Sequence, residues 1–523
     1  MPIIALVFSA FEMDQSGSFQ HLLETVLLTY SLNTLLLIIG VVFFSFVFAL
    51  PVAWFVACCD FPTRKILQWA LMLPLALPPY IVAIVYTDLL DYSGPIQQFL
   101  RKLMGWQHYS DYFFPDIRSL FGAILILSLA LYPYLYLLLR GAFLGQSGEL
   151  FQAARSLGLS PIRAFIKVSL PLSRSATAVG LSLIAMESLG DFATVNYFAV
   201  NTLTTGVYDT WLELGSLNTA AKISSLMLLI LVILITLENY SRRQLKVYQG
   251  KGATQTELGF VLLGWKKYAV LFYAWGLLFF AFLLPILTLL YYAYHYFEQS
   301  LNQSLWLFSL NSVWLAVIVA FLGVIIALIV NFYHRLSPGI FAKMTIRLSS
   351  LGYAIPGTVV AIAVLIPFTS LDIGLNRWLV EHSFSRVGLL FSGSLFILVM
   401  AYLVRFSAIA VGSIDSSLNQ VSPSLDHAAR SLGLSPAKTI RRVNLPLIRK
   451  GMLTAFILVF IEAMKELPTA LLLRPFNFET LATYVYQFVS DEMIELAALP
   501  ALIIVLMGLL PFIIVNRLME KER

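Results

Sequence analysis

Long apolar stretches separated by short polar segments are the main pattern along this chain. Each stretch approaches or exceeds the roughly 20 mostly apolar residues that a helix needs to cross a bilayer, and most are too long for membrane strands. We therefore predict an all-α polytopic membrane protein with about eleven or twelve transmembrane helices. The expected spans are Leu23–Ala57, Ile66–Leu90, Ser119–Arg140, Leu172–Gly190, Ile223–Leu237, Tyr268–Phe297, Leu307–Tyr333, Ile346–Phe368, Val387–Gly412, Leu447–Leu467 and Ala498–Val515.

Composition agrees with a chain that lies in lipid. Hydrophobic residues make up 59% of the sequence and charged residues 12%, which is about half the charged share of a soluble domain. The apolar opening Met1–Phe11 is short and lacks a basic start, so it does not match a signal peptide. We therefore expect the helices to be in contact with membrane lipid.

One nine-residue segment occurs twice in this sequence. Ala153–Pro161 reads AARSLGLSP, and Ala428–Pro436 repeats it 275 positions later. A repeat at this distance indicates two folded lobes, because solenoid units are about 20 to 50 residues long. We predict two pseudo-symmetric helical halves, residues 1–240 and 266–523, joined by a basic linker at 241–265. The same offset aligns Glu187 with Glu462 and Asp191 with Glu466, and an offset of 278 aligns Ser31–Thr34 with Ser309–Ser312 and Pro78 with Pro356.

Lysine and arginine residues predict the orientation of the chain. They concentrate in alternate loops, including those with the two nonapeptides, and in the C-terminal tail. Basic loops are retained in the cytoplasm, so both nonapeptides and the C-terminus are expected on the cytoplasmic side of the inner (plasma) membrane. The net charge of +6 follows from this asymmetry, and nucleic acid is therefore not an expected partner.

Both nonapeptides predict a short helix, a turn and a second short helix. The alanines favour a helix, glycine suits the turn, and Ser-Pro suits a helix start. Such a segment is either a knob that docks into a partner's groove or an elbow that turns the chain; its presence in two nearly identical copies favours docking. The candidate docking residues are Ala153, Ala154, Gly158, Ser160 and Pro161 in one copy and Ala428, Ala429, Gly433, Ser435 and Pro436 in the other.

These residues resemble the EAA loop of ABC importer permeases, although Gln152 and His427 replace the glutamate of its E-A-A pattern. The resemblance implies a type I importer permease fold and two copies of a separate ATPase subunit, one on each loop. The chain has no G-x-x-x-x-G-K-[ST] phosphate loop. We therefore expect a transport subunit that is not an enzyme and binds no cofactor, with ATP and Mg held by the ATPase partners.

Four duplicated acids lie within apolar stretches, where charges are costly and usually mark function. Their spacing of four places each pair on one helical face if the helix continues through it. We expect Glu187, Asp191, Glu462 and Glu466 to line a translocation path between the halves and to offer oxygen ligands to a hard cation. The alternative is a structural role, in which they pair with Lys465, Arg474 or helix ends.

The segment Lys465–Thr483 resembles the signature of ferric-iron permeases that depend on a binding protein. That resemblance implies import of ferric iron delivered by an extracytoplasmic binding protein. Permeases for thiamine, sulfate, molybdate, phosphonates or polyamines share the general plan and remain alternatives. A duplicated secondary transporter is an alternative of another class, while a membrane enzyme is disfavoured because no catalytic or metal constellation is evident.

Overall fold

The computed structural model describes residues 2–12, 17–146, 148–243 and 260–520. In these residues the strands are two short pieces that pair in parallel, β1 (Cys59–Asp60) and β2 (Phe260–Val261), and the rest of the regular structure is helical. The all-helical prediction is confirmed. The division at 241–265 stays a prediction, because residues 244–259 lie outside the described part.

The helices of the first half are α1 (Pro2–Phe11), α2 (Ser18–Thr25), α3 (Leu27–Cys58), α4 (Arg64–Ala70), η1 (Leu73–Ala76), α5 (Pro79–Leu90), α6 (Pro95–Met104), η2 (Tyr109–Asp111), α7 (Leu120–Leu144), α8 (Gly148–Ser156), α9 (Pro161–Ala164), η3 (Phe165–Ser169), α10 (Leu170–Leu172), α11 (Arg174–Gly190), α12 (Ala193–Tyr197), α13 (Leu203–Leu212) and α14 (Leu217–Arg243). The main parts of the first half are, in order, the long helix α3, a pair of helical segments that meet at a sharp bend (α4–η1 and α5–α6), the long helix α7, the first nonapeptide and the long helix α14.

The second half repeats this order from its long helix α18 onward. Its helices are α15 (Trp265–Leu278), η4 (Phe279–Leu283), α16 (Leu284–His295), α17 (Phe297–Ser300), α18 (Gln303–Leu336), α19 (Ile340–Leu351), η5 (Gly352–Ala354), α20 (Gly357–Glu381), α21 (Leu395–Asn419), α22 (Pro423–Ser431), α23 (Pro436–Thr439), η6 (Ile440–Asn444), α24 (Leu445–Leu447), α25 (Arg449–Lys465), α26 (Pro468–Leu473), α27 (Leu481–Ser490) and α28 (Ile494–Glu520).

Among the described residues, seven helices are long and apolar enough to cross a membrane, and two bent pairs bring the number to nine if each pair is one span. The expected eleven spans also included α25 and α28. These two are not counted here because α25 has only 17 residues and the apolar stretch of α28, Ile494–Leu509, is also short. The seven are Leu27–Cys58, Leu120–Leu144, Leu217–Ser241, Trp265–His295, Gln303–Leu336, Gly357–Glu381 and Leu395–Asn419.

Two of the expected spans break well inside their length, and they do so at equivalent positions; in addition, the expected span Val387–Gly412 is helical only from Leu395. The stretch Ile66–Leu90 is interrupted between η1 and α5, where the bent pair turns by 92°. The stretch Ile346–Phe368 is interrupted between η5 and α20. Pro78 and Pro356 immediately precede the new helices, and the residue before each proline is extended. Proline disfavours helix in the residue before it, so the chain restarts there.

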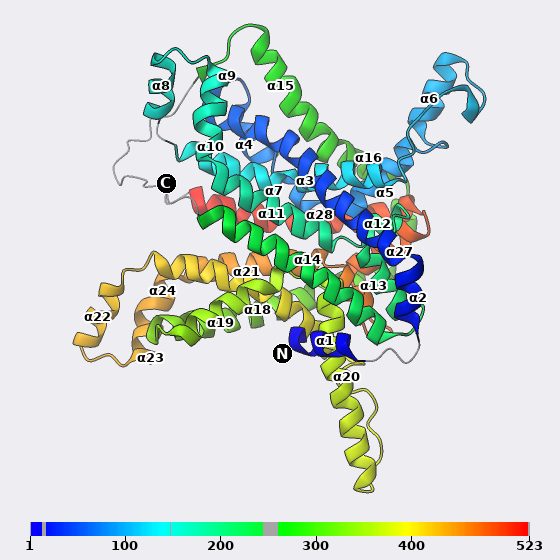
Figure 1. Ribbon diagram of the computed structural model, residues 1–523, viewed down its shortest axis with the longest axis vertical. Helices are drawn as coiled ribbons and strands as arrows, with labels where there is room; N and C mark the ends of the chain where they lie inside the picture. Colours follow the sequence, from blue (N-terminus) through cyan, green and yellow to red (C-terminus); the bar gives the residue numbers. More distant parts are fainter. Residues whose placement is uncertain (1, 13–16, 147, 244–259, 521–523) are drawn as a thin grey trace.

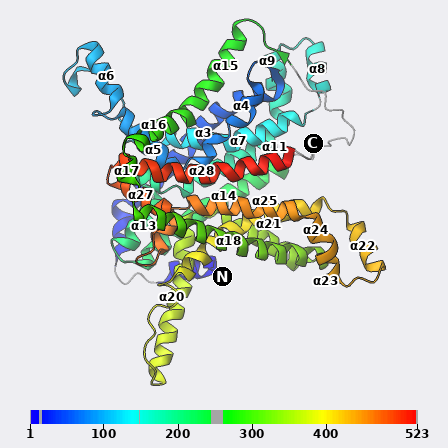
Figure 2. The same ribbon diagram turned by 180° about the vertical axis from the view of Figure 1, so that it is seen from behind.

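The two halves are interlocked rather than side by side. The second half's α15 and α16 pack on α3 and α5 of the first half, while α1 and α14 of the first half pack on α20 of the second. Each of the two large hydrophobic clusters therefore contains residues from both halves. Figures 1 and 2 show the result, with α8 and α22 projecting at one end of the bundle and α6 at the other.

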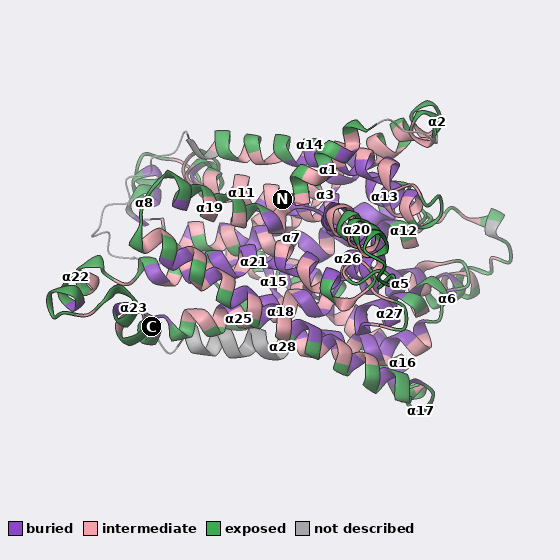
Figure 3. Cartoon of the chain, turned by 90° about the horizontal axis from the view of Figure 1, so that it is seen from below, coloured by how far each residue is buried: buried purple, intermediate pink, exposed green. Residues whose placement is uncertain are grey.

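Tyrosine hydroxyls reinforce this interlocking with hydrogen bonds to the other half. Tyr86 donates to the Phe280 carbonyl at 2.6 Å, Tyr273 to the Val47 carbonyl at 3.0 Å, and Tyr292 to the Asp88 carboxylate at 2.8 Å. Figure 3 shows buried positions along the centre of the bundle and exposed ones at projecting segments such as α22. Exposed large apolar side chains such as Leu310 on α18 suit a surface that faces lipid.

The repeated Ser-Leu-Asn-Thr/Ser segment has the same structural role in each half. Asn33 donates to the Asn201 carbonyl at 2.9 Å, and Asn311 donates to the Glu479 carbonyl at 3.1 Å. The next residue's hydroxyl accepts the first backbone N–H of α13 or α27, at 3.0 and 2.6 Å. These side chains satisfy helix-start groups that the helix itself leaves unpaired, which fixes α13 and α27 against the long helices α3 and α18.

The break before α20 depends on a close backbone approach at Gly352. A Cβ atom there would lie 2.0 Å from the Val404 carbonyl oxygen. We expect Gly352→Ala to destabilise the protein by about 1–3 kcal/mol, because backbone must move to make room. Thermal unfolding in detergent measures this, with Gly412→Ala as the control because a Cβ at Gly412 meets nothing within 4 Å. Equal unfolding temperatures for the two variants would contradict the packing described.

Candidate functional sites

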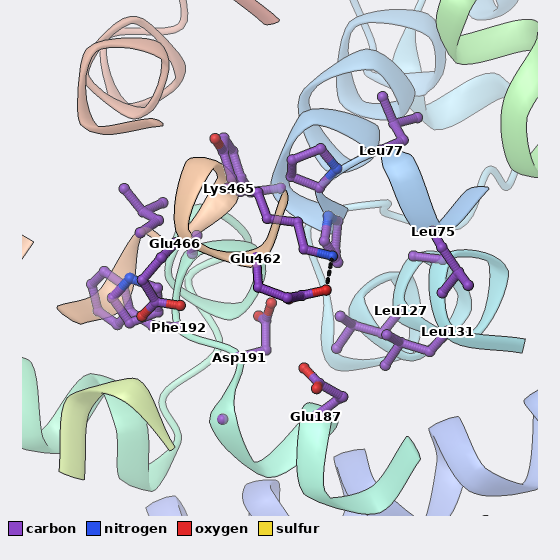
Figure 4. Close-up of a pocket in the computed structure, with 18 of the residues that line it drawn as sticks. Leu75, Leu77, Leu127, Leu131, Glu187, Asp191, Phe192, Glu462, Lys465 and Glu466 are labelled. Atoms are coloured by element: carbon purple, nitrogen blue, oxygen red, sulfur yellow. Dashed lines mark ion pairs between the residues drawn. The ribbon is translucent and has the colours of Figure 1, made fainter. Parts of the chain in front are cut away.

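A cavity of about 120 Å³ lies between the halves, and all four predicted acids line it. Its wall comes from η1 and α5, from α7, and from the junctions that follow α11 and α25. Figure 4 shows Glu187, Asp191 and Glu462 gathered around one space, while Glu466 turns to one side. We call this cavity the acidic pocket. The structure thus brings together residues that are up to 279 positions apart in the sequence.

The second acid of each pair does not share a helical face with the first, so that expectation was wrong. Helix α11 ends at Gly190 and α25 ends at Lys465, and the acids that follow them have extended backbone. Asp191 instead accepts hydrogen bonds from the backbone N–H groups of Thr194 and Val195, at 3.1 and 3.2 Å. Its carboxylate therefore caps the short helix α12, whose N-terminal dipole favours negative charge.

Glu466 makes the same cap and carries an additional ion pair. It accepts from the backbone N–H and the hydroxyl of Thr469, at 3.2 and 2.5 Å. Arg405 on α21 donates to both of its carboxylate oxygens at 2.6 Å. Only 6% of the Glu466 side chain and 12% of the Arg405 side chain are exposed. Glu466 thus has the structural role that the sequence analysis gave as an alternative, in which the acid pairs with a basic residue and a helix end. Its basic partner is Arg405 and not Lys465 or Arg474.

Gly357, at the start of α20, completes this buried arrangement. A Cβ atom at Gly357 would lie 2.5 Å from the guanidinium of Arg405 and 2.7 Å from the carboxylate of Glu466. The Thr469 hydroxyl, which donates its hydrogen to Glu466, also lies 3.2 Å from the Gly357 carbonyl oxygen. Glycine is therefore the residue that lets the restarted helix α20 contact the ion pair.

The first acid of each pair keeps its place on its helix and points into the acidic pocket. Glu462 forms an ion pair with Lys465, one turn away, at 2.9 Å. Glu187 lies beside the hydroxyl of Tyr353, and no lysine or arginine of the described residues lies within ion-pairing distance of it or of Asp191. The two halves thus present similar backbones and acids but different positive charges.

The arrangement is not a coordination shell for a metal ion. Within the described residues, no group of three or more histidine, cysteine, aspartate or glutamate side chains is placed to hold one. The expectation that Glu187, Asp191, Glu462 and Glu466 jointly offer metal ligands is therefore not met in this structure. Asp191 and Glu466 accept hydrogen bonds at the starts of α12 and α26, and Glu462 is paired with Lys465.

A larger cavity of about 920 Å³ adjoins the acidic pocket. The two share Glu187, Gly190 and Arg405 as lining residues. From there the larger cavity extends to the end of α14 and to α19, and α19 lies toward the end of the bundle that carries α22 (Figure 1). A continuous lining thus runs from the acidic pocket toward the repeated loops.

The two nonapeptides form nearly identical projecting elbows, which we call the repeated loops. Gly158 and Gly433 have φ of +86° and +81°, a left-handed conformation that favours glycine. Ser160 and Ser435 cap the next helix by accepting from the backbone N–H two positions after the proline. The predicted helix, turn and helix are thus present in both copies, though each second helix contains a π-helical turn, η3 or η6.

The two alanines of each repeated loop have different surroundings. Ala153 and Ala428 are exposed, whereas Ala154 and Ala429 are buried beneath the elbow. Leu157 and Leu432, which the sequence did not single out, are 85% and 83% exposed. An exposed leucine at the tip of each projecting loop is an apolar group available to a partner.

The repeated loops are seated on the bundle by different contacts. In the first, Phe151 is buried against Ala154 and Ala164. In the second, the equivalent position is Asp426, which forms an ion pair with Arg335 at 2.7 Å. Arg335 also donates to the carbonyls of Leu418 and Val421. The exposed surface of the two loops is therefore the same, because it comes from the shared nonapeptide. Apolar packing holds the first loop on the bundle, and an ion pair holds the second.

Sequence reasoning missed Arg405, although a signal was present. It is the one charged residue in the apolar stretch Val387–Gly412, and a charge in such a stretch is expected to have a partner or a function. No aligned arginine exists in the first half, where Ala130 occupies the equivalent position. Arg405 therefore lies outside the duplicated pattern of charges.

A duplicated helical bundle with an intramembrane pocket between its halves and a projecting loop on each half defines a membrane permease. The chain belongs to the family described as the binding-protein-dependent transport system inner membrane component, which matches residues 49–246 and 320–522. Members are inner-membrane, multi-pass permease subunits of ABC importers. They are not enzymes, and they work with a separate ATPase and a binding protein.

Full-length relatives share about a quarter of their residues with this chain. It is 24% identical to the Fe(3+)-transport system permease protein FbpB 2 of Haemophilus influenzae over 522 residues, covering 99% of this chain and 95% of the relative. It is 25% identical to the ferric transport system permease protein FbpB of Actinobacillus pleuropneumoniae, covering 91% and 69%. The molybdenum transport system permease protein ModB of Escherichia coli K12 is 31% identical over 178 residues, covering 34% and 72%.

Removal of the guanidinium at Arg405 should leave a buried, unpaired carboxylate. We expect Arg405→Ala to cost about 3–5 kcal/mol of stability, and Glu466→Gln in the same chain to recover part of it. Arg118→Ala is the matched control, because its partner Glu492 is 60% exposed and such a pair contributes about 0–1 kcal/mol. Thermal unfolding of the purified variants measures both losses, and similar losses would contradict a special role for the buried pair.

Proposed function

We propose that this permease imports ferric iron from an extracytoplasmic binding protein into the cytoplasm. The full-length relatives named above carry ferric transport in their names, and their similarity extends over at least nine-tenths of this chain. The molybdenum relative named above matches only 34% of it. The length of the match therefore favours the ferric permeases over the other families with the same plan.

The charge of the acidic pocket is the observation that carries the choice of substrate. Four carboxylates, those of Glu187, Asp191, Glu462 and Glu466, face two cationic groups, those of Arg405 and Lys465. The lining thus has an excess of negative charge when all six groups are ionised. Such a lining attracts a cation and repels a dianion such as sulfate. We assign Glu187 and Glu462 to the translocation path, with Asp191 and Glu466 supporting it as helix caps.

The repeated loops are proposed as cytoplasmic docking sites for two ATPase copies. Each projects from the bundle and presents an exposed leucine and alanine on a capped, glycine-stabilised elbow. The short helices α9, η3 and α10 connect the first loop to α11, which carries Glu187, and α23, η6 and α24 connect the second loop to α25, which carries Glu462. In the first half a bend of 70° separates the short helices from α11. Closure of the ATPase pair would therefore move both walls of the acidic pocket and produce alternating access.

The test of substrate is transport by the complete complex in proteoliposomes, with its ATPase and binding protein. We expect ATP hydrolysis and uptake of radioactive iron to rise with iron-loaded binding protein. We also expect Glu187→Gln and Glu462→Gln to lower iron uptake by about tenfold or more, equivalent to ~1.4 kcal/mol, because each removes a charge facing the ion. Stimulation by a different loaded binding protein would overturn the substrate, and uptake without any ATPase would favour a secondary transporter.

The test of the repeated loops is a polar substitution at each tip. We expect Leu157→Asp and Leu432→Asp to weaken ATPase binding, each by about 2 kcal/mol if the leucine is a central interface contact. Folding should be unaffected, because both side chains are exposed. Phe113→Asp is the control, since Phe113 is 92% exposed in the segment between α6 and α7. Unchanged ATPase affinity in both leucine variants would contradict docking at these loops.

A further inference from the structure

The duplication breaks down at two positions that line the acidic pocket. Lys465 corresponds to Gly190, and Arg405 corresponds to Ala130, so both basic residues belong to the second half. The first half has the smallest side chains at the same points. The pocket is therefore symmetric in its acids and asymmetric in its bases.

The two basic residues are held differently. Arg405 is almost fully buried and bonds the carboxylate of a helix cap, so it is part of the wall. Lys465 has a flexible stem, and its ammonium group is 2.9 Å from the Glu462 carboxylate at the edge of the cavity (Figure 4). The side chains of Lys465 and Glu462 are 21% and 22% exposed, so both have access to the space of the pocket.

Helix stability does not account for Lys465. Its partner is three positions away on the same helix, so the ion pair ties no second element to α25. Pairs of this type stabilise a helix by only about 0.2–0.5 kcal/mol. A lysine in an apolar span has a cost much larger than that gain, which indicates that its charge serves the pocket.

We propose that Lys465 is a tethered counter-ion, which occupies the cation position beside Glu462 at rest and is displaced by the transported ion. The proposal rests on the proposed function in one respect, namely that the permeating species is a cation. The ammonium neutralises Glu462 without leaving the pocket. Glu187, with no lysine or arginine of the described residues in ion-pairing distance, lines the same pocket from the first half and attracts the incoming ion.

Displacement would give selectivity for highly charged cations. A sodium or potassium ion gains about the same Coulomb energy from Glu462 as the ammonium that is already there, and the tether keeps that ammonium at high local concentration. A trivalent ion gains about three times as much at the same distance. The permease would thus exclude the abundant monovalent cations, whose leak would dissipate the membrane potential, and would still admit a trivalent cargo.

The first test measures monovalent leak with a voltage-sensitive dye in proteoliposomes under a potassium gradient, without iron or binding protein. We expect Lys465→Met to increase potassium and sodium conductance several-fold and Lys465→Arg to restore the barrier. The control is Lys343→Met, which removes an exposed lysine from α19. Equal conductance in Lys465→Met, Lys343→Met and the natural protein, with similar thermal stability, would overturn the proposal.

The second test uses the repeat itself to add a counter-ion. A Cβ at Gly190 would make only ordinary contact, at 3.5 Å from Pro356, so Gly190→Lys is expected to fold and to place an ammonium beside Glu187. We expect iron uptake to fall several-fold with no rise in monovalent leak, while uptake by Lys465→Met becomes sensitive to excess sodium. Uptake that is unchanged in Gly190→Lys and insensitive to sodium in Lys465→Met would contradict displacement.

The two tests separate this proposal from the function on which it rests. If the natural complex shows no iron-dependent uptake, the ferric assignment fails. The leak measurement still decides whether Lys465 guards the pocket against monovalent cations, because it needs neither iron nor the binding protein.

Discussion

A charge buried among apolar helices is costly unless it is paired, and the ion pair between Arg405 and Glu466 meets this condition in the lining of the acidic pocket. An unpaired charge in such a place costs several kcal/mol. The guanidinium holds a carboxylate that also caps α26, and Gly357 allows the start of α20 to approach both groups. Helices α20, α21 and α26 of the second half are thereby held together around this ion pair. Arg405 and Glu466 also line the acidic pocket.

The first half reaches a similar backbone arrangement with less charge. Asp191 caps α12 with hydrogen bonds to Thr194 and Val195, and no arginine is aligned with Arg405. A helix N-terminus favours a carboxylate by about 0.3–1 kcal/mol at exposed sites and more where it is partly buried, so a cap provides part of what an ion pair would. The two halves thus share the backbone geometry of the pocket and differ in its electrostatics, notably at the positions of Arg405 and Lys465.

Interlocking of the halves has a mechanical consequence. Because helices of each half complete the hydrophobic cluster of the other, neither half can move without repacking against its neighbour. The 17-residue helices α11 and α25 follow the repeated loops after a series of short helices and end at the acid pairs. Under the proposed coupling, a displacement of either loop would reach one wall of the pocket through these short helices and then through α11 or α25.

The sequence by itself determined the class of this protein. Apolar stretches of spanning length required an all-helical membrane fold, and the exact nonapeptide repeat revealed two halves and two similar elbows, because helix periodicity, turn glycines and caps are local properties of the chain. The four acids were also found from sequence, since a charge in an apolar stretch is conspicuous in one dimension.

Tertiary structure decided what those acids do. The sequence suggested two acids on one helical face, but the helices end between them because Asp191 and Glu466 bond to the backbone of the next helix. Likewise, only packing shows that Lys465 meets Glu462 at a cavity and that α1 and α15 cross to the other half. Local sequence fixes where helices are favoured, whereas the pairing of buried charges and the filling of a shared core depend on residues that are distant in the chain.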